Sequence, residues 1–326
     1  MDAIFLFLIQ TAPLEKGLGF RSARQEAPDF LLSLKSVRRH LVRVELTAVE
    51  IRRAVRAALA EDLGSGDATT LATVPAGARS VAFMNARQPL VVAGIHFAEL
   101  AFRELSPKIQ IRRFVRDGRR VKAGSPLLKI SGSSRAVLSA ERVALNFVQR
   151  LSGVATATAQ FADAIKDSKA KILDTRKTTP GWRHFEKYAV KCGGGRNHRI
   201  GLFDMVLIKD NHLVALQNEK PNAIAAAVAR ARKKFPRLKV EAEADTLEQV
   251  AQAADAGVDI ILLDNMPPAQ LRRAVKIVRG RAKTEASGGV NLKTVRSIAA
   301  TGVDFISVGA ITHSACAVDI GLDFEE

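Results

Sequence analysis

The sequence is poor in cysteine and in aromatic residues. Among its 326 residues there are two Cys, one Trp and one Tyr, beside 15 Phe. Cys192 and Cys316 are too few for a disulfide framework, and two cysteines alone do not make a structural zinc site. We therefore expect a reducing compartment, and specifically the cytoplasm. The scarcity of Trp and Tyr also leaves little surface on which the bases of single-stranded nucleic acid could stack.

Long apolar runs are missing as well. The apolar segment at residues 4–9 is too short to span a bilayer, and no basic residue precedes it as in a secretory signal. Glu15, Glu26 and Asp29 argue against an acid-poor transit peptide. We expect residues 1–44 to be a poorly ordered extension, and we expect no membrane partner.

Positive charge, by contrast, is abundant. The formal net charge is +17 and the pI is near 10.3, which raises nucleic-acid binding as a rival class of function. No long run of Lys or Arg occurs, however, and many of the cations follow short apolar segments. This placement favours an enzyme for a small, multiply charged anion, and we expect no nucleic-acid partner.

The first part of the chain predicts a small α+β domain at residues 45–150. An apolar stripe at helical spacing predicts a helix over residues 48–63. A second helix is expected over residues 139–151 and carries Arg142 on its polar face. Residues 311–326 are a candidate to return to this domain.

From about residue 151 to 310 the pattern changes to short apolar strands alternating with helices. Units of about twenty residues with continuous apolar strands are typical of a parallel β/α barrel. The strands are predicted at residues 171–173, 205–208, 238–242, 259–263, 283–286 and 304–308. These units are too few for a full eightfold barrel.

Polar and charged residues follow the predicted strands, and in such barrels the active site lies at the carboxyl ends of the strands. In chain order they are Arg176, Lys177, Lys209, Glu243, Asp264, the run Ser287-Gly288-Gly289, and Gly309. Burying an unpaired carboxylate is unfavourable. Glu243 and Asp264 are therefore expected either to pair with a lysine or to bind a substrate.

The last two loops suit a phosphate group. Open glycine backbone followed by the start of a helix offers N–H groups to an anion, although a glycine pair alone is also compatible with a simple turn. His313, shortly beyond the last strand, supports the phosphate interpretation. The residues alone thus indicate a barrel enzyme that joins a phosphosugar, with Mg²⁺ as a partner of the carboxylates, to a di- or polycarboxylate. The pattern of a P-loop kinase is absent.

Several separated motifs resemble one family. The segments DTRKTTPG, KYAVKCGGGRNHR, LIKDNH and ERVALNFVQRLSG are similar to quinolinate phosphoribosyltransferase, also called carboxylating nicotinate-nucleotide pyrophosphorylase, and the similarity runs from about Leu46 to Asp323. The resemblance implies an α/β fold, with an incomplete parallel β/α barrel packed against a smaller α+β sandwich domain. It also implies that quinolinate and phosphoribosyl pyrophosphate give nicotinate mononucleotide, pyrophosphate and carbon dioxide, with Mg²⁺, in NAD biosynthesis.

The resemblance further implies a role for each matching residue. Arg142 is expected to reach the active site of the partner subunit in a homodimer, while Lys177 lies near both substrates, and Glu243 and Asp264 serve the ribose hydroxyls and the metal. The other residues expected at the quinolinate carboxylates are Thr175, Arg176, His198, Arg199 and Lys209. Those expected at the phosphates are Ser287, Gly288, Gly289, Val308, Gly309, Ala310 and His313. A paralogue that uses another anionic acceptor is the alternative.

Overall fold

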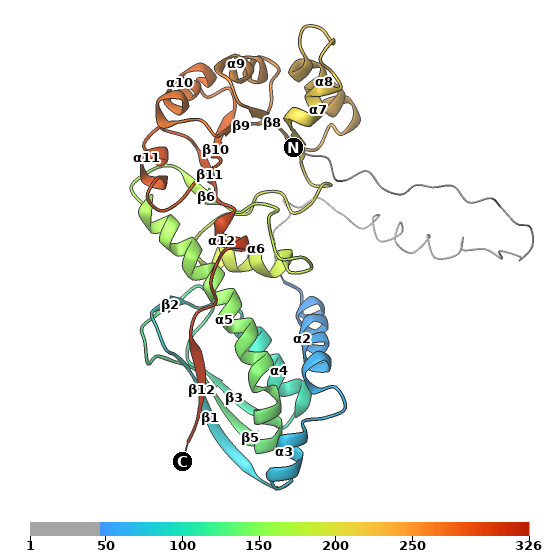
Figure 1. Cartoon of the computed structure of the whole chain (residues 1–326), viewed down its shortest axis with the longest axis vertical. Helices are drawn as coiled ribbons and strands as arrows, with labels where there is room; N and C mark the ends of the chain where they lie inside the picture. The colour runs from blue at the N-terminus through green and yellow to red at the C-terminus, as the bar shows by residue number, and fades with distance from the viewer. Residues whose placement is uncertain (1–45, 326) are drawn as a thin grey trace, which may run out of the picture. The chain divides into compact units, whose positions relative to one another are not determined.

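The computed structural model describes residues 46–325, so the predicted extension at residues 1–44 lies outside the described residues (Figure 1). The first helix, α2 (Ala48–Leu63), has the bounds that its apolar stripe predicts. It begins with a capping box, in which the Thr47 hydroxyl accepts from the Glu50 N–H and the Glu50 carboxylate accepts from Thr47. Within the described residues, no helix is both long enough and apolar enough to cross a bilayer.

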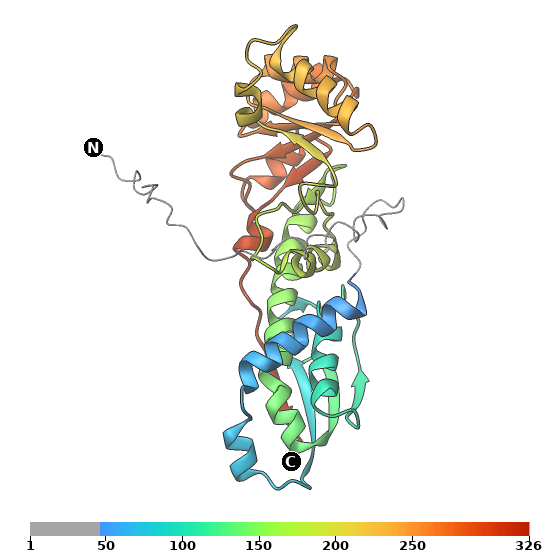
Figure 2. The same ribbon diagram turned by 90° about the vertical axis from the view of Figure 1, so that its right-hand side faces the viewer.

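Four antiparallel strands form one sheet in the order β12-β1-β5-β3. They are β1 (Arg79–Ala86), β3 (Gln110–Arg113), β5 (Pro126–Ser133) and β12 (Ile320–Phe324). The accompanying elements are α3 (Ala68–Thr73), α4 (Ile95–Leu105) and the short pair β2 (Leu90–Val91) and β4 (Arg120–Val121). Strand β12 comes from the end of the chain and pairs antiparallel with β1, which brings two distant segments together (Figure 2). The domain boundaries given above stay a prediction.

Helix α5 (Ser134–Ala164) is much longer than the predicted helix at residues 139–151, and both predicted bounds were wrong. We expected the helix to stop before Gly153, but the helix continues through that residue. A Cβ at Gly153 would lie 2.1 Å from the Cys316 carbonyl oxygen, so the glycine is there to let a second segment approach. Helix α5 consequently contacts elements of both sheets.

Six parallel strands form the second sheet in the order β6-β11-β10-β9-β8-β7. They are β6 (Lys171–Leu173), β7 (Val206–Ile208), β8 (Val240–Ala244), β9 (Ile260–Asp264), β10 (Lys283–Ser287) and β11 (Phe305–Ser307). The helices that follow them are α6 (Arg183–Cys192), α7 (Asp210–Val214), α8 (Ala223–Lys234), α9 (Leu247–Asp255), α10 (Pro268–Val278), α11 (Val295–Ala299) and α12 (Ala310–His313). Strands β6 and β7 do not pair with each other, so the barrel is incomplete and the predicted fold class is confirmed.

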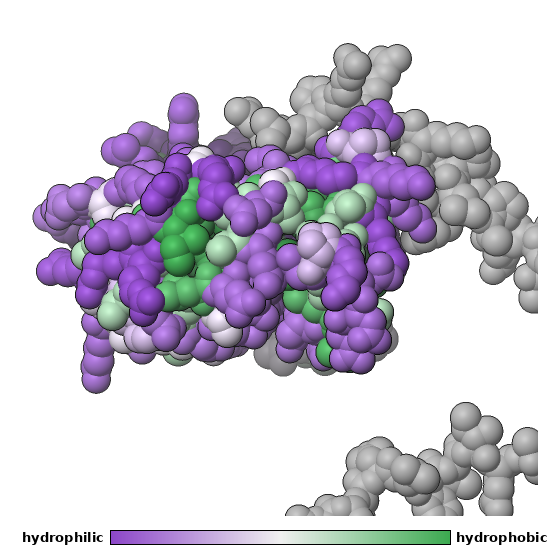
Figure 3. Space-filling view, turned by 90° about the horizontal axis from the view of Figure 1, so that it is seen from above, coloured by the Kyte–Doolittle hydropathy of each residue, from purple (hydrophilic) through white to green (hydrophobic). Residues whose placement is uncertain are grey.

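Two helix starts differ from those that the sequence pattern predicts, which are a capping box of Asp245 with Glu248 and a helix that begins at Asn291. The capping box of α9 is formed by Thr246 and Gln249, one residue after the predicted pair. Asn291 caps a turn by accepting from the backbone N–H groups of residues 293 and 294, and the helix proper begins later. The end of the molecule that carries α8, α9 and α10 in Figure 1 is seen from above in Figure 3. Its surface is mostly hydrophilic with a smaller apolar area.

Candidate active site

A cavity of about 590 Å³ lies at the carboxyl ends of the parallel strands. Most of the residues predicted to form the site line it, namely Thr175, Arg176, Lys177, His198, Arg199, Lys209, Glu243, Asp264, Ser287, Gly288 and Gly289. Five further lining residues escaped the sequence analysis, namely Leu207, Leu262, Asn265, Glu285 and Ser307. The sheet therefore brings residues from the ends of all six strands to one rim, as expected for parallel strands, and the loop after α6 adds His198 and Arg199.

Arginine and lysine side chains make one wall of this cavity positive. The Nε atom of Arg176 is buried without a hydrogen-bond partner. Burial, followed by the nearby charge of Arg176, lowers the pKa of Arg199. A buried donor without a partner and two neighbouring guanidinium groups are arranged for an anion with more than one carboxylate.

The rim also carries two carboxylates, those of Glu243 and Asp264. The Glu243 carboxylate lies 3.5 Å from Lys209 Nζ, and burial is the main cause that raises its pKa. Asp264 accepts a hydrogen bond of 2.7 Å from the side chain of Asn265. Carboxylate oxygens of Glu243, Asp264 and the exposed Asp245 all lie within 4.8 Å of one another. Such a set of hard oxygen ligands fits Mg²⁺.

The loop after β10 is shaped by close backbone packing. Asn265 adopts a left-handed φ of 52°, and its N–H donates to the Ser287 carbonyl over 3.0 Å. Gly288 has a φ of 91°, and a Cβ there would lie 2.0 Å from the Asn265 side-chain oxygen. Only glycine fits at this position, which leaves the loop backbone open toward the cavity.

The loop after β11 meets the loop after β6. A Cβ on Gly309 would lie 3.1 Å from His313 Nε2 and 3.3 Å from Lys177 Cδ. The Thr312 hydroxyl donates to the Lys177 carbonyl over 2.7 Å. Of the predicted phosphate residues, Val308, Gly309, Ala310 and His313 do not line the cavity, although Gly309 lies beside both His313 and Lys177, and Lys177 does line it.

A buried ion pair between Asp174 and Lys187 holds the loop that carries His198. Both side chains are fully buried and in direct contact. Asp174 also accepts from the His198 N–H over 2.9 Å and from the Asn197 side chain over 2.6 Å. Burial raises the pKa of Asp174 and lowers that of Lys187, and the attraction between them opposes both changes. The pair fixes where the loop enters the cavity.

Two glutamates lie deeper than the residues that the sequence pattern selects. His198 Nε2 lies 2.8 Å from Glu241 Oε2 and 3.7 Å from Glu285 Oε2. Burial raises the pKa of Glu241 to about 7 and that of Glu285 to about 8. The sequence could have identified Glu241, because side chains two residues apart on a strand point to the same side. Glu241 therefore shares the face of Glu243.

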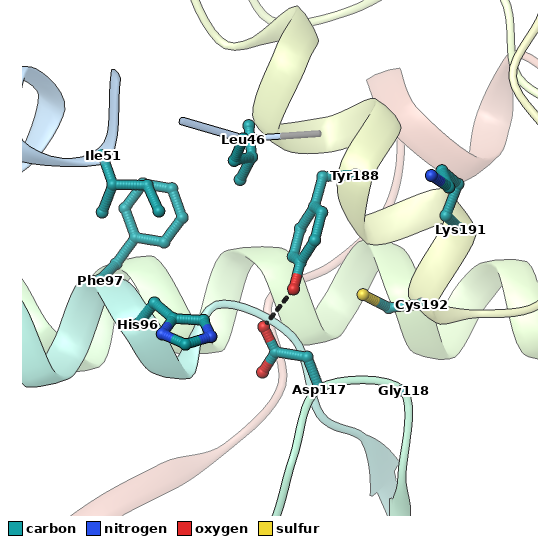
Figure 4. A pocket seen from close by; sticks show the side chains of 9 residues that line it. All are labelled: Leu46, Ile51, His96, Phe97, Asp117, Gly118, Tyr188, Lys191 and Cys192. Atoms are coloured by element: carbon teal, nitrogen blue, oxygen red, sulfur yellow. Dashed lines mark hydrogen bonds between the residues drawn. The ribbon is translucent and has the colours of Figure 1, made fainter. Parts of the chain in front are cut away.

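A second cavity of about 570 Å³ is lined by α2, α4, α6 and the turn after β3 (Figure 4). The Tyr188 hydroxyl donates to Asp117 over 2.7 Å, and Asp117 also accepts from the N–H groups of Gly94 and Ile95 at the start of α4. Cys192 lines this cavity, and burial raises its pKa to about 12, which suits a bystander rather than a nucleophile. None of the predicted site residues lines it.

Arg142 does not line the active-site cavity of its own chain. It lies exposed on α5, outside the residues that the parallel sheet brings together. Its predicted role in a neighbouring subunit stays a prediction.

The fold and the cavity define a β/α-barrel enzyme with a site for anionic substrates. Comparison with known sequences defines it further. The family model "Quinolinate phosphoribosyl transferase, N-terminal domain" matches residues 67–152, and the model of the C-terminal domain matches residues 154–323. The chain belongs to the quinolinate phosphoribosyltransferase family.

Individual relatives agree with this assignment. The chain is 45% identical to a carboxylating nicotinate-nucleotide pyrophosphorylase of Mycobacterium leprae, over 83% of this chain and 96% of that protein. It is 42% identical to the chloroplastic protein of the same name from Arabidopsis thaliana, over 85% and 83%. The solved structure of the nicotinate-nucleotide pyrophosphorylase from Francisella tularensis superposes with a TM-score of 0.81 at 41% identity, covering 86% of this chain and 98% of that chain.

Proposed function

We infer that this chain catalyses the reaction of quinolinate with phosphoribosyl pyrophosphate. The products are nicotinate mononucleotide, pyrophosphate and carbon dioxide, and the reaction is a step of NAD biosynthesis. The observation that carries this inference is a single cavity that is lined both by Arg176, Arg199 and Lys209 and by the carboxylates of Glu243 and Asp264. Family membership over both domains supports it.

We propose a division of the cavity into two halves. Arg176, Arg199, Lys209 and His198, with Thr175, hold the two carboxylates of quinolinate, since a guanidinium fork suits a planar carboxylate. Lys177 lies between the halves and contacts both substrates. The loops at Ser287–Gly289 and Val308–Ala310, with His313, bind phosphate through open backbone N–H groups.

Bond breaking at the ribose carbon is assisted by negative charge. As pyrophosphate leaves, positive charge develops on that carbon, and the carboxylates of Glu243 and Asp264 stabilise it. The pyridine nitrogen then forms the new bond to the same carbon. Mg²⁺, when bound, neutralises charge on the pyrophosphate, and the oxygens of Glu243 and Asp264 are the residues that would hold it.

Loss of carbon dioxide follows from the chemistry of the ring. The bond from the ring to the carboxylate next to the nitrogen breaks, and its electron pair stays on the ring carbon beside the quaternised nitrogen. That carbon then takes up a proton. No protein nucleophile is needed, and this agrees with the place of Cys192 in the other cavity.

The activity test is direct. Purified protein with phosphoribosyl pyrophosphate and Mg²⁺ should release pyrophosphate and carbon dioxide in equal amounts when quinolinate is added. Nicotinate, which lacks the second carboxylate, should not replace it. Turnover with another anionic acceptor and none with quinolinate would show that the chain is a paralogue with a different substrate.

We also propose that the active site is shared in a homodimer, with Arg142 reaching the neighbouring cavity. Its exposure on α5, away from its own cavity, supports this arrangement. Arg142→Ala and Lys209→Ala protein, each nearly inactive alone, should regain about a quarter of parental activity when subunits exchange at equal amounts. Arg176→Ala mixed with Lys209→Ala is the control and should regain none, because both residues line the same cavity. Absence of recovery with Arg142→Ala would place that residue in its own chain's site.

The compartment stays a prediction. The names of plant relatives place those proteins in chloroplasts and mitochondria, so members of the family work in more than one compartment. The cytoplasmic location expected from the cysteine content is proposed for this chain.

A further inference from the structure

Two buried acids beneath the acceptor half of the cavity are unexpected on electrostatic grounds. The side chain of Glu241 is fully buried and that of Glu285 is 1% exposed, and Glu285 lines the cavity beside His198. The proposed acceptor carries two negative charges. Two further negative charges directly below it would repel it and would be poorly solvated.

The hydrogen bonds of this pair are incomplete in a particular way. One oxygen of each carboxyl has a partner: Glu241 Oε2 faces His198 Nε2, and Glu285 Oε1 contacts the Ser307 hydroxyl. The other two oxygens, Glu241 Oε1 and Glu285 Oε2, are buried without a partner. One oxygen of each carboxyl and a ring nitrogen of His198 all lie within 4.8 Å of one another. A single proton between the two neighbouring carboxyls would satisfy both oxygens at once.

We propose that Glu285 is a positioning residue that is held as a neutral carboxylic acid, keeps its proton while donating a hydrogen bond to Glu241, and thereby keeps His198 oriented under the acceptor. Only one negative charge then lies below the cavity, and that charge is used to hold the imidazole. This inference rests on the proposed function, because it is the dicarboxylate acceptor that makes a second negative charge harmful.

The surroundings of Glu285 assign the proton to it rather than to a neighbour. On the adjacent strand β9 it faces apolar Leu262, and on β11 it faces Ser307. The charged or titratable groups that face it are Glu241 on β8 and His198 on the loop after α6. Burial raises the pKa of Glu285 and the charge of Glu241 raises it further, whereas His198 lowers it.

The charged residues that act on Glu241 and on His198 are of both signs. Arg199 and Lys209 act on Glu241, with Glu243 opposing them. Lys187 and Asp174 act on His198 with opposite signs. Among the described residues, no Lys or Arg forms an ion pair with Glu285, and its one contact of this kind is with His198. An anionic Glu285 is therefore not compensated.

The test compares the parent with Glu285→Gln, which has the same shape and cannot ionise. The quantity is kcat/KM for quinolinate at saturating phosphoribosyl pyrophosphate. Between about pH 7 and pH 9, ionisation of Glu285 should lower the parental value about tenfold relative to that of the variant. The variant should be active at about pH 7, and the two proteins are compared by the shape of the pH profile, each normalised to its own value at pH 7. Glu248→Gln, an exposed substitution on α9, is the matched control and should keep the parental profile.

An equal alkaline loss in the parent and in Glu285→Gln would overturn the proposal, as would a variant that is inactive at neutral pH although folded. A merely structural role for Glu285 would not move the pH profile. If the parent itself shows no turnover with quinolinate, the proposed function fails instead, and infrared spectroscopy still decides the state of Glu285.

Infrared spectroscopy tests whether Glu285 is protonated, and this measurement on the parent protein does not depend on whether a variant folds. The parent at neutral pH should show the carbonyl band of a protonated carboxylic acid, and the band should vanish at alkaline pH. Ser307→Ala, which removes the hydrogen bond to Glu285, should shift the frequency of the band and so assign it. A neutral-pH spectrum without an acid carbonyl band would overturn the proposal.

Discussion

Two buried clusters of acidic residues hold the same residue, His198, but they differ in how completely their hydrogen bonds are satisfied. Asp174 accepts a hydrogen bond from the backbone N–H of His198, and its other partners are Lys187 and the side chain of Asn197. Glu241 and Glu285 surround its side chain, and each keeps one buried oxygen without a partner. The Nε of Arg176, which lines the same cavity as Glu285, is likewise buried without a hydrogen-bond partner.

This difference distinguishes residues that stabilise the fold from residues that serve the active site. A fully satisfied buried network gains nothing from a ligand, and losing one member leaves the others uncompensated. A network with free donors and acceptors is less well satisfied in the free protein, and it gains partners when a substrate or a proton arrives. We therefore expect substitutions in the first cluster to change stability and those in the second to change activity and its pH dependence.

The largest effect is expected from Lys187→Met. Removing the cation leaves Asp174 as a buried charge without compensation, which should lower the free energy of unfolding by about 3–5 kcal/mol. Urea unfolding followed by circular dichroism measures this change. Lys276→Met, at an exposed position of α10, is the control and should change stability by less than about 0.5 kcal/mol.

A double substitution sharpens this prediction. Lys187→Met combined with Asp174→Asn removes both charges and should be more stable than Lys187→Met alone. If the double variant is instead the less stable one, the two residues do not act as a pair, and the cluster is held together by its neutral hydrogen bonds.

Arg176→Lys should affect activity rather than stability. An ammonium group keeps the charge but not the planar pair of donors, so kcat/KM for quinolinate should fall about thirtyfold, or about 2 kcal/mol. The unfolding free energy should stay within about 0.5 kcal/mol of the parent, because Arg176 Nε has no partner to lose. Steady-state kinetics and urea unfolding on the same preparation make the comparison. A stable variant with parental turnover would remove Arg176 from the carboxylate clamp.

The pH dependence of the free energy of unfolding should reveal the ionisation of Glu285 in the second cluster. The pKa of Glu285 in the folded protein is raised to about 8, from an ordinary value of 4.5. Its contribution to stability is therefore complete at pH values below the ordinary pKa and is lost as the pH rises toward 8. Over this window the parent should lose stability more steeply than Glu285→Gln, by up to about 1.4 kcal/mol per pH unit, which corresponds to one proton. Equal slopes would contradict a neutral Glu285.

The smallest effect is expected in the second cavity. Tyr188→Phe removes one hydrogen bond to Asp117, which keeps its two backbone donors on α4. Stability should fall by about 1 kcal/mol, and kcat and KM should not change. A change in either kinetic constant would show that this cavity communicates with the active site.

The sequence by itself determined the order of the parallel strands along the chain and most of the rim. Apolar strands ending in charged residues are a local pattern, so the sequence alone places Lys209, Glu243 and Asp264 at the carboxyl edge of the sheet. The motifs around Arg176 and His198 identified the family for the same reason, because they are contiguous in the chain.

Contacts between distant segments were decided only by the tertiary structure. Strand β11 lies between β6 and β10 although it comes last of the six, and this order places Ser307 against Glu285 and Gly309 against Lys177. The same holds for Gly153, whose place in α5 makes sense only beside Cys316. Helical or strand periodicity reports which side of an element is buried. It does not report which other element covers that side, since this depends on sheet order and packing that join residues far apart in the sequence.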